Sequence, residues 1–362
     1  MADAQQSNEN QSKSSSIIRW FKRLLLGGLL AIVILVSSLF GVRYWVNQWA
    51  ETPIANFHAA EIIVARGDSA HRVINRLKSD GQITHSEPFK ALFILQPQLA
   101  QLKAGHYAIP ANVSPTQLLE ILGSGIEKQF SVTFIEGSTF SQWLTILNDH
   151  PQIQFRQQRV NDYIESFSPS SVDEEKYKFA RVEGHFFPDT YHFTAKTPAI
   201  AILKRANVML EQKLTTLWQE RDRTVPLTTK HDALVLASII EKETGIASER
   251  PEIASAFVNR INRRMRLQTD PTVIYGMADV YDGDITYAHM RDKNAYNTYV
   301  IKGLPPTPIA MVSEGAIHAA LNPATTPYIY FVASGDGGHV FSTNLKDHHR
   351  ATKRYLAKLK QQ

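Results

Sequence analysis

The sequence predicts an α+β protein that begins with one membrane-spanning helix and continues into two folded domains. A long uncharged apolar run lies near the N-terminus, and helical and strand-like apolar patterns alternate along the rest of the chain. Of the 362 residues, 43% are hydrophobic, which is enough to build buried cores. The predicted parts are a cytoplasmic tail (1–23), a transmembrane helix (24–42), a linker (43–59), a small β-α-α-β domain (60–126) and a larger α+β domain with a mixed sheet (127–362).

The apolar run from Leu24 to Val42 carries no charge. As a helix it would be about 28 Å long, which matches the hydrocarbon core of a bilayer. A cleaved signal peptide is the alternative, but the following RYWVNQW offers no small-residue cleavage site. Positive charge gathers before the run, at Arg19, Lys22 and Arg23. We therefore expect a single-pass protein of the cytoplasmic (inner) membrane, with its N-terminus in the cytoplasm and the rest in the periplasm.

The segment 60–126 is expected to form a unit of its own. EIIVARG reads as a strand, SAHRVINRLKSDG and EPFKALFILQP as two helices, and LKAGHYAIP as a second strand. Ser114-Pro115 then opens another helix that stops at Gly125. This β-α-α-β order, with V-x-x-G-D-S near its start, resembles a LysM-like glycan-binding module. A small packing domain without a ligand is the alternative.

The larger domain shows both strand and helix signals. Phe130, Val132 and Phe134 alternate with polar residues, and 329–342 reads as a hairpin around a Gly-Asp-Gly-Gly turn. The segment 201–221 has the pattern of a long amphipathic helix. We expect the strands to form a mixed sheet beside several helices.

A helix over 228–245 carries the main catalytic candidate. Thr229 and Asp232 form a capping-box pattern at its start, and the apolar positions recur at helical spacing up to Glu243 (Leu236, Ile239 and Ile240). A carboxyl group at the end of a buried stripe loses hydration, which raises its pKa toward the range that a general acid needs. The alternatives are that Glu243 pairs with an arginine or lies in solvent at the helix end.

Composition and motifs exclude several other functions. The chain has no cysteine, so disulfides and thiol catalysis are excluded, and its net charge of +5 is modest. The 13 histidines form no H-E-x-x-H, and we find no zinc-finger spacing, phosphate-binding loop, dinucleotide fingerprint or G-x-S-x-G. We therefore expect no metal, no cofactor and no nucleic-acid partner.

Together, several ordered motifs identify a resemblance to the YceG-like family, the endolytic murein transglycosylases. The motifs are EGHFFPDTY, ASIIEKETG, FVNRINRRMRLQTDPTVIYG, AYNTY, GLPPTPIA, AALNPA, YIYFVA and GGHVFSTN. The resemblance covers nearly all of the chain after about residue 20, with mild departures at His185 and Thr307. It implies that Glu243, the second Glu of E-K-E-T, is catalytic. It also implies cleavage of the β-1,4 bond between N-acetylmuramic acid and N-acetylglucosamine inside peptidoglycan strands, which terminates strand growth. The expected partners are these strands, the cytoplasmic membrane and peptidoglycan synthases.

The implied reaction needs only one carboxylate, which would protonate the leaving oxygen and then deprotonate the muramyl 6-hydroxyl. The candidates for orienting the sugars are polar and aromatic residues of the loops 266–277 and 294–310 and of the hairpin: Gln268, Tyr275, Tyr296, Asn297 and His339. A further glutamate, Glu183, is a candidate second carboxylate. Each loop alone could be an ordinary surface loop, and His339 an ordinary strand histidine. A water-using muramidase and a non-catalytic glycan-binding scaffold remain as competing functions.

Overall fold

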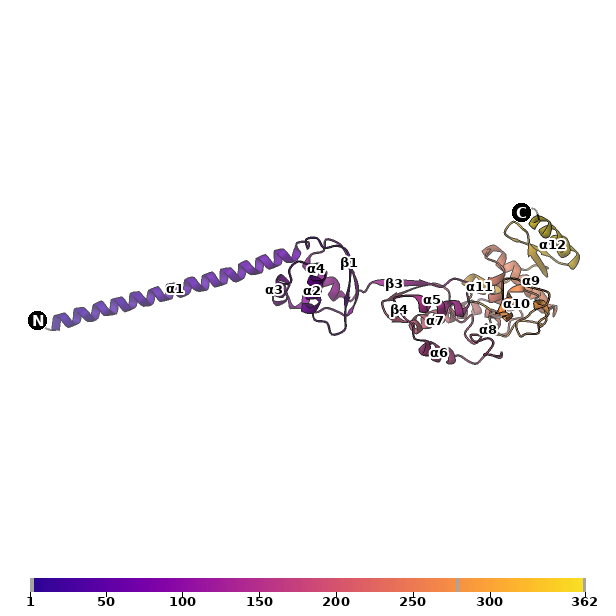
Figure 1. Cartoon of the computed structure of the whole chain (residues 1–362), viewed down its shortest axis with the longest axis horizontal. Helices are drawn as coiled ribbons and strands as arrows, with labels where there is room; N and C mark the ends of the chain where they lie inside the picture. The colour runs from indigo at the N-terminus through magenta and orange to yellow at the C-terminus, as the bar shows by residue number, and fades with distance from the viewer. Residues whose placement is uncertain (1–2, 278–279, 361–362) are drawn as a thin grey trace. The chain divides into compact units, whose positions relative to one another are not determined.

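The computed structural model describes residues 3–277 and 280–360, with side chains from residue 20 onward. The chain divides into two compact units, Met1–Lys128 and Gln129–Gln362, each with its own helices, strands and buried core (Figure 1).

Helix α1 (Asp3–Glu51) contains the predicted apolar span. Its segment Trp20–Glu51 is long and apolar enough to cross a membrane. The helix continues past Val42, where the predicted span ends, into the predicted linker (43–59), because its last turns pack into the core of the smaller unit. Val46 and Ala50 are buried in that unit's core, and the Trp49 ring meets the Phe89 ring edge-on at 5.0 Å.

The smaller unit is built around a strand pair. Strands β1 (Ala60–Val64) and β2 (Gly105–Ile109) are antiparallel, with Ala60 opposite Ile109 and Val64 opposite Gly105. Between them lie two helices and a 3-10 helix, and one more helix follows: α2 (Ala70–Ser79), α3 (Glu87–Leu95), η1 (Pro97–Ala100) and α4 (Pro115–Ser124). The order of strand, two α-helices and strand is the one predicted from the sequence.

The strands of the larger unit form three separate pairs. β3 (Gln129–Thr133) pairs with β5 (Thr190–Thr194) and β7 (Tyr330–Ala333) with β8 (His339–Ser342), both antiparallel, whereas β4 (Ile153–Gln154) and β6 (Thr197–Pro198) are parallel. The predicted hairpin is therefore confirmed, but the prediction of one mixed sheet is wrong for the part of the chain that the structure describes. These strands are only two to five residues long, and helices pack directly against β4, β6, β7 and β8.

Helices make most of the larger unit. They are α5 (Phe140–Asp149), α6 (Gln157–Glu165), α7 (Ala199–Gln219), α8 (Lys230–Glu243), η2 (Ala247–Glu249), α9 (Arg250–Asn262), α10 (Asp270–Met277), η4 (His289–Arg291), α11 (Glu314–Leu321) and α12 (Leu345–Leu359). One apolar core lies among α7, α8, α9 and α11, and another lies between α5, α7 and the β3–β5 pair.

Helix α8 is the central helix of the first of these cores. The predicted capping box of Thr229 and Asp232 is present at its start. Every side chain from Ala233 to Ile240 is buried, and the helix packs against α9, α10 and α11. A helix that is apolar on all sides must be enclosed by other elements. Its final residue, Glu243, is thereby fixed where α8 emerges from the core.

Candidate active site

A cavity of about 570 Å³ opens at the C-terminal end of α8. Its walls come from six regions: the ends of α8 and α9, the residues leading into α10, the segment that carries Tyr299, the β7–β8 hairpin and the start of α12. The polar and aromatic side chains that line it include Glu243, Arg260, Gln268, Thr269, Asp270, Tyr299, Tyr330, His339, His348 and His349. Two of the predicted sugar contacts, Gln268 and His339, therefore share one cavity with Glu243.

Glu243 is held by a hydroxyl group from the neighbouring segment. The Thr269 hydroxyl donates a hydrogen bond to Glu243 Oε1. Burial raises the pKa of Glu243 to about 7, and the negative charge of Asp270 adds to this, against the opposing effects of the Thr269 hydrogen bond, His339 and Arg260. The group is therefore present in both protonated and ionised forms near neutral pH, as a residue that acts first as an acid and then as a base requires.

The backbone beside Glu243 is held in an uncommon conformation. Gln268 has φ of 52°, in the left-handed region that costs a residue with a Cβ atom free energy. The amide of Gln268 donates to the carbonyl of Thr298 at 3.2 Å, and the amide of Thr269 donates to the Thr298 hydroxyl at 3.1 Å. These bonds hold the segment so that the Thr269 hydroxyl reaches Glu243 while the Gln268 side chain lines the cavity.

His339 is oriented by a carboxylate from η2. Its backbone amide donates to Glu249 Oε1 at 2.9 Å, and its ring Nδ1 lies 2.7 Å from Glu249 Oε2. Although burial opposes it, these hydrogen bonds lower the pKa of Glu249, so the carboxylate is ionised. A histidine whose Nδ1 is bound to a carboxylate keeps one ring orientation and presents Nε2. Nε2 makes no hydrogen bond to a described residue.

The cavity also contains residues that the sequence analysis did not select. Asp270 is a second carboxylate there, and the Tyr299 hydroxyl donates to its Oδ1 at 2.7 Å. Arg260 enters from α9, and Tyr330 and His348 from β7 and α12. Local signals existed for Asp270, which directly follows Gln268 and Thr269, and for Tyr299, which lies in the 294–310 loop. The other three come from distant segments that only the fold brings together.

Glu183 and Tyr275 form a separate, closed cluster. Glu183 is only 2% exposed, its Oε1 accepts from the amide of Phe140 at 2.9 Å, and its Oε2 accepts from the Tyr275 hydroxyl at 3.3 Å. Burial raises the pKa of Glu183 to about 8. Phe140 is the first residue of α5, so this carboxyl group binds a helix N-terminus. Neither residue lines the Glu243 cavity.

Tyr296 and Asn297 are fully buried, and their polar atoms are bonded within the protein. The Tyr296 hydroxyl lies 2.7 Å from that of Thr307, and the Asn297 side-chain amide donates to the carbonyls of His289 and Asp292 at 3.0 and 2.7 Å. The first contact lies within the 294–310 segment, the other two connect that segment to the residues before it, and neither side chain lines the cavity.

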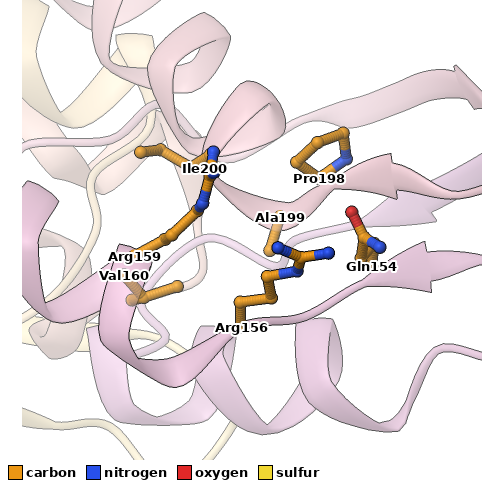
Figure 2. Close-up of a pocket in the computed structure, with 7 residues that line it drawn as sticks. All are labelled: Gln154, Arg156, Arg159, Val160, Pro198, Ala199 and Ile200. Carbon is orange, nitrogen blue, oxygen red and sulfur yellow. The ribbon is translucent and has the colours of Figure 1, made fainter.

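A smaller cavity of about 200 Å³ in the same unit has a different chemistry (Figure 2). Residues of β4, α6 and the start of α7 line it: Gln154, Arg156, Arg159, Val160, Pro198, Ala199 and Ile200. With two arginines and no carboxyl group, it offers no general acid. Across the described residues, no group of three or more His, Asp or Glu side chains is placed to hold a metal ion.

The part of the chain that contains this cavity matches a known protein family. The YceG-like family matches residues 62–354, which include every residue that lines the Glu243 cavity. The chain belongs to this family. The membership predicted from the sequence motifs is thus confirmed.

Two relatives carry a name that states an activity. The "Endolytic murein transglycosylase" of Bacillus subtilis (strain 168) is 28% identical over 312 residues, which cover 82% of this chain and 84% of that protein. The protein of the same name from Streptococcus pneumoniae (strain ATCC BAA-255 / R6) is 24% identical over 343 residues, 87% of this chain and 61% of the relative. The chain thus matches less than two thirds of the pneumococcal relative's length.

The chain is also similar to a solved structure, the crystal structure of a YceG-like protein from Listeria monocytogenes. It is 26% identical, has a TM-score of 0.48, and is matched over 81% of this chain and 98% of its own.

Proposed function

We propose that this YceG-like protein is an endolytic murein transglycosylase that uses Glu243 as its single acid and base. The observation that carries the proposal is a carboxyl group with a pKa of about 7, held by Thr269 and open to a 570 Å³ cavity. The names of the two relatives support the substrate and the reaction. The bond cleaved is the β-1,4 bond between N-acetylmuramic acid and N-acetylglucosamine inside a strand, and its cleavage ends strand elongation.

In the proposed reaction, protonated Glu243 gives its proton to the glycosidic oxygen as the bond from that oxygen to the muramyl C1 breaks. The leaving N-acetylglucosamine then carries a new hydroxyl group. The Glu243 carboxylate next takes the proton of the muramyl 6-hydroxyl, whose oxygen attacks C1 and closes a 1,6-anhydro ring. No water is consumed, and Glu243 ends protonated, ready for another cycle.

The remaining predicted site residues divide into two roles in this proposal. Gln268 and His339, which line the cavity, bind the sugars directly. Tyr275, Tyr296 and Asn297 support the surrounding loops, because their polar groups are bonded to other protein groups. Glu183 serves as a structural carboxyl group at the start of α5 and takes no part in the chemistry.

The proposal also includes a location. The apolar segment of α1 would anchor the chain in the cytoplasmic membrane, with the N-terminus in the cytoplasm and both units in the periplasm. The smaller unit, with its β-α-α-β order, would act as a LysM-like module that binds glycan. Peptidoglycan synthases in the same membrane are the protein partners that such a location and substrate suggest.

The test uses the full-length protein in detergent with un-crosslinked glycan strands, and the products are analysed by mass spectrometry. Internal cleavage to 1,6-anhydromuramyl ends by the wild type, and its loss in Glu243→Gln, would support both the reaction and the residue. Binding without cleavage by the wild type would instead favour a non-catalytic scaffold.

A muramidase is the second candidate, and Asp270 is the observation that favours it. A hydrolase uses two carboxyl groups on the scissile bond, and Asp270 lies in the same cavity as Glu243, whereas Glu183 does not. Its products would carry reducing ends and weigh one water more than anhydro products. In that case Asp270→Asn would stop cleavage as completely as Glu243→Gln. Under the transglycosylase mechanism, Asp270→Asn retains anhydro-product formation.

A further inference from the structure

Arg260 is a buried cation that lacks an acidic partner. The side chain is 7% exposed, its Nε donates to the carbonyl of Ile329 at 2.6 Å, and its Nη1 donates to the carbonyl of Leu267 at 2.5 Å. Nη1 also donates to the carbonyl of Arg266 at 3.3 Å, all three acceptors are neutral, and no carboxylate of a described residue lies within 4.0 Å of the guanidinium group. Burying a charge without a counter-charge is strongly unfavourable, so this arrangement points to an anion from outside the protein.

The two carboxylates of the cavity make no ion pair with Arg260, although its charge and that of Glu243 influence each other. Glu243 accepts a hydrogen bond from Thr269, and Asp270 accepts one from Tyr299. Arg260 Nη2 donates to neither of them, nor to any other described residue, and it is not among the enclosed unpaired atoms. Because Arg260 lines the cavity, Nη2 is available to a ligand there.

His348 provides a second unused polar atom in the same place. Its ring stacks on the Tyr330 ring at 5.0 Å and 18°, and the Arg260 guanidinium lies 5.1 Å from the centre of the Tyr330 ring. The Nδ1 atom of His348 is enclosed and has no hydrogen-bond partner, whereas Nε2, which makes no hydrogen bond to a described residue, is not enclosed and is the ring nitrogen that a ligand in the cavity can reach. Burial lowers the pKa of His348, and the nearby Arg260 lowers it further, so the ring is neutral near pH 7 and can donate one N–H.

We propose that Arg260 and His348 form a subsite that binds a carboxylate of the substrate beside Glu243. A guanidinium group presents its N–H donors in a planar fork that fits a carboxylate, and Tyr330 holds the two side chains against one ring. In a glycan strand the N-acetylglucosamine units are neutral, whereas the muramyl units carry the lactyl carboxyl group or, attached to it, a stem peptide with carboxylates of its own. The subsite therefore selects muramyl units.

This selection rests on the proposed function and adds a reason for its specificity. Only a muramyl unit at the Glu243 carboxyl group gives a 1,6-anhydromuramyl product, and neutral sugar contacts alone distinguish the two alternating sugars poorly. A charge-assisted hydrogen bond that only one of them can make fixes the position of the strand in the cavity. The carboxylate could be the lactyl group of peptide-free strands or a carboxylate of the stem peptide.

The experiment compares strands that differ only in their carboxylates. Full-length enzyme in detergent is given peptide-free strands with free lactyl groups, the same strands converted to lactyl methylamides, peptide-bearing strands, and peptide-bearing strands with amidated carboxylates. We expect kcat/KM to fall about tenfold on amidation of the strand type that supplies the carboxylate, mainly through KM. The pair that shows the fall identifies the source.

Two variants connect this preference to the subsite. Arg260→Gln should abolish the difference between carboxylate and amide strands. Because Arg260 also holds Ile329 and Leu267, His348→Gln on α12 is the second variant, and it should reduce the preference about threefold while lowering the thermal midpoint only slightly, through loss of the ring contact with Tyr330. If both variants instead lose kcat/KM by the same factor on carboxylate and amide strands, so that the preference is unchanged, the two residues have only a structural role and the subsite is overturned.

Binding separates the subsite from the reaction itself. The same four strands are titrated into Glu243→Gln, in which no cleavage interferes. Tighter binding of the carboxylate strands supports the subsite even if the wild type cleaves nothing and the proposed function fails. Cleavage of all four strands at equal rates and with equal affinities overturns the subsite while the proposed function stands.

Discussion

Glu243 and Glu183 are two acids of the larger unit with similar perturbations and different surroundings. Burial raises the pKa of Glu243 to about 7 and that of Glu183 to about 8, and each accepts a hydrogen bond from a hydroxyl group, of Thr269 and of Tyr275. Glu243 lines a 570 Å³ cavity, and its Oε2 makes no hydrogen bond to a described residue. Both oxygens of Glu183 are occupied, one of them by the first amide of α5.

The difference shows that a raised pKa does not by itself identify a catalytic acid. Desolvation acts alike on a carboxyl group that supports a helix and on one that waits for a substrate. What distinguishes Glu243 is access to a cavity and an oxygen atom that is free to exchange a proton.

Substitution of the two acids should affect cleavage very differently. Glu243→Gln keeps the shape of the side chain but cannot transfer a proton, so we expect kcat to fall by about 10² to 10⁴. Glu183→Gln should keep at least about half of the wild-type kcat, since its amide oxygen can still accept from Phe140. Initial rates of strand cleavage at pH 7 measure both, and a comparable loss in the two variants would contradict the comparison.

Glu183→Gln should instead change how stability depends on pH. The pKa of Glu183 is about 8 in the folded protein and near 4.5 when unfolded, so the folded state binds more protons between these values. The wild type therefore loses stability as the pH rises from about 4.5 to about 8, by an amount on the order of a few kcal/mol.

The variant, which cannot ionise at this position, should lack that loss. Thermal unfolding of both proteins at pH 5 and pH 9 tests this. The variant should gain on the wild type at the higher pH, and parallel behaviour at the two pH values would argue against a buried, protonated Glu183.

The two acids also show what the sequence could reveal and what it could not. Glu243 was accessible to prediction because its helix is local: the Thr229 cap and the apolar stripe before it lie within one segment. The partners of Glu183 are Phe140 and Tyr275, which are distant in sequence, so its role as a support for α5 left no local pattern. The catalytic role of Glu243, which the helical pattern alone left open, is implied by the family resemblance and stays a prediction.

The same reasoning explains the other successes and failures. The hairpin of β7 and β8 was predicted correctly because alternation and a Gly-rich turn are local signals. The mixed sheet was wrong because strand pairing depends on long-range packing, and here helices pack against the short strands β4, β6, β7 and β8. In the sequence, Arg260 is only one polar residue of a predicted helix. The fold alone places it beside Tyr330 and in the cavity of Glu243.

Removing the hydroxyl group that donates to each acid should again affect Glu243 and Glu183 differently, with a smaller effect on cleavage than replacing the acids themselves. Thr269→Val has the same shape but deletes the hydrogen bond that lowers the pKa of Glu243. In the proposed reaction cleavage begins with protonated Glu243, so the alkaline limb of kcat/KM should move upward from about pH 7 by about one pH unit. Tyr275→Phe, which deletes the donor of Glu183, is the matched control and should leave that limb in place. If Tyr275→Phe also moves the alkaline limb, the pH profile reports the ionisation of Glu183 and not that of Glu243.

The smallest expected effect concerns the strained backbone beside Glu243. Gln268 has φ of 52°, so Gln268→Gly should stabilise the fold by about 1 kcal/mol or less, because glycine adopts this conformation without a Cβ clash. Gln268→Ala keeps the strain and also removes the side chain from the cavity. Both variants should therefore raise KM by a similar, several-fold factor, while only the glycine variant gains in thermal unfolding. If KM stays unchanged in both, Gln268 serves the backbone that carries Thr269 and not the sugar. If Gln268→Ala gains as much thermal stability as Gln268→Gly, the backbone strain at this position is negligible. The rigidity of the Glu243 site then comes from the hydrogen bonds of Thr298 alone.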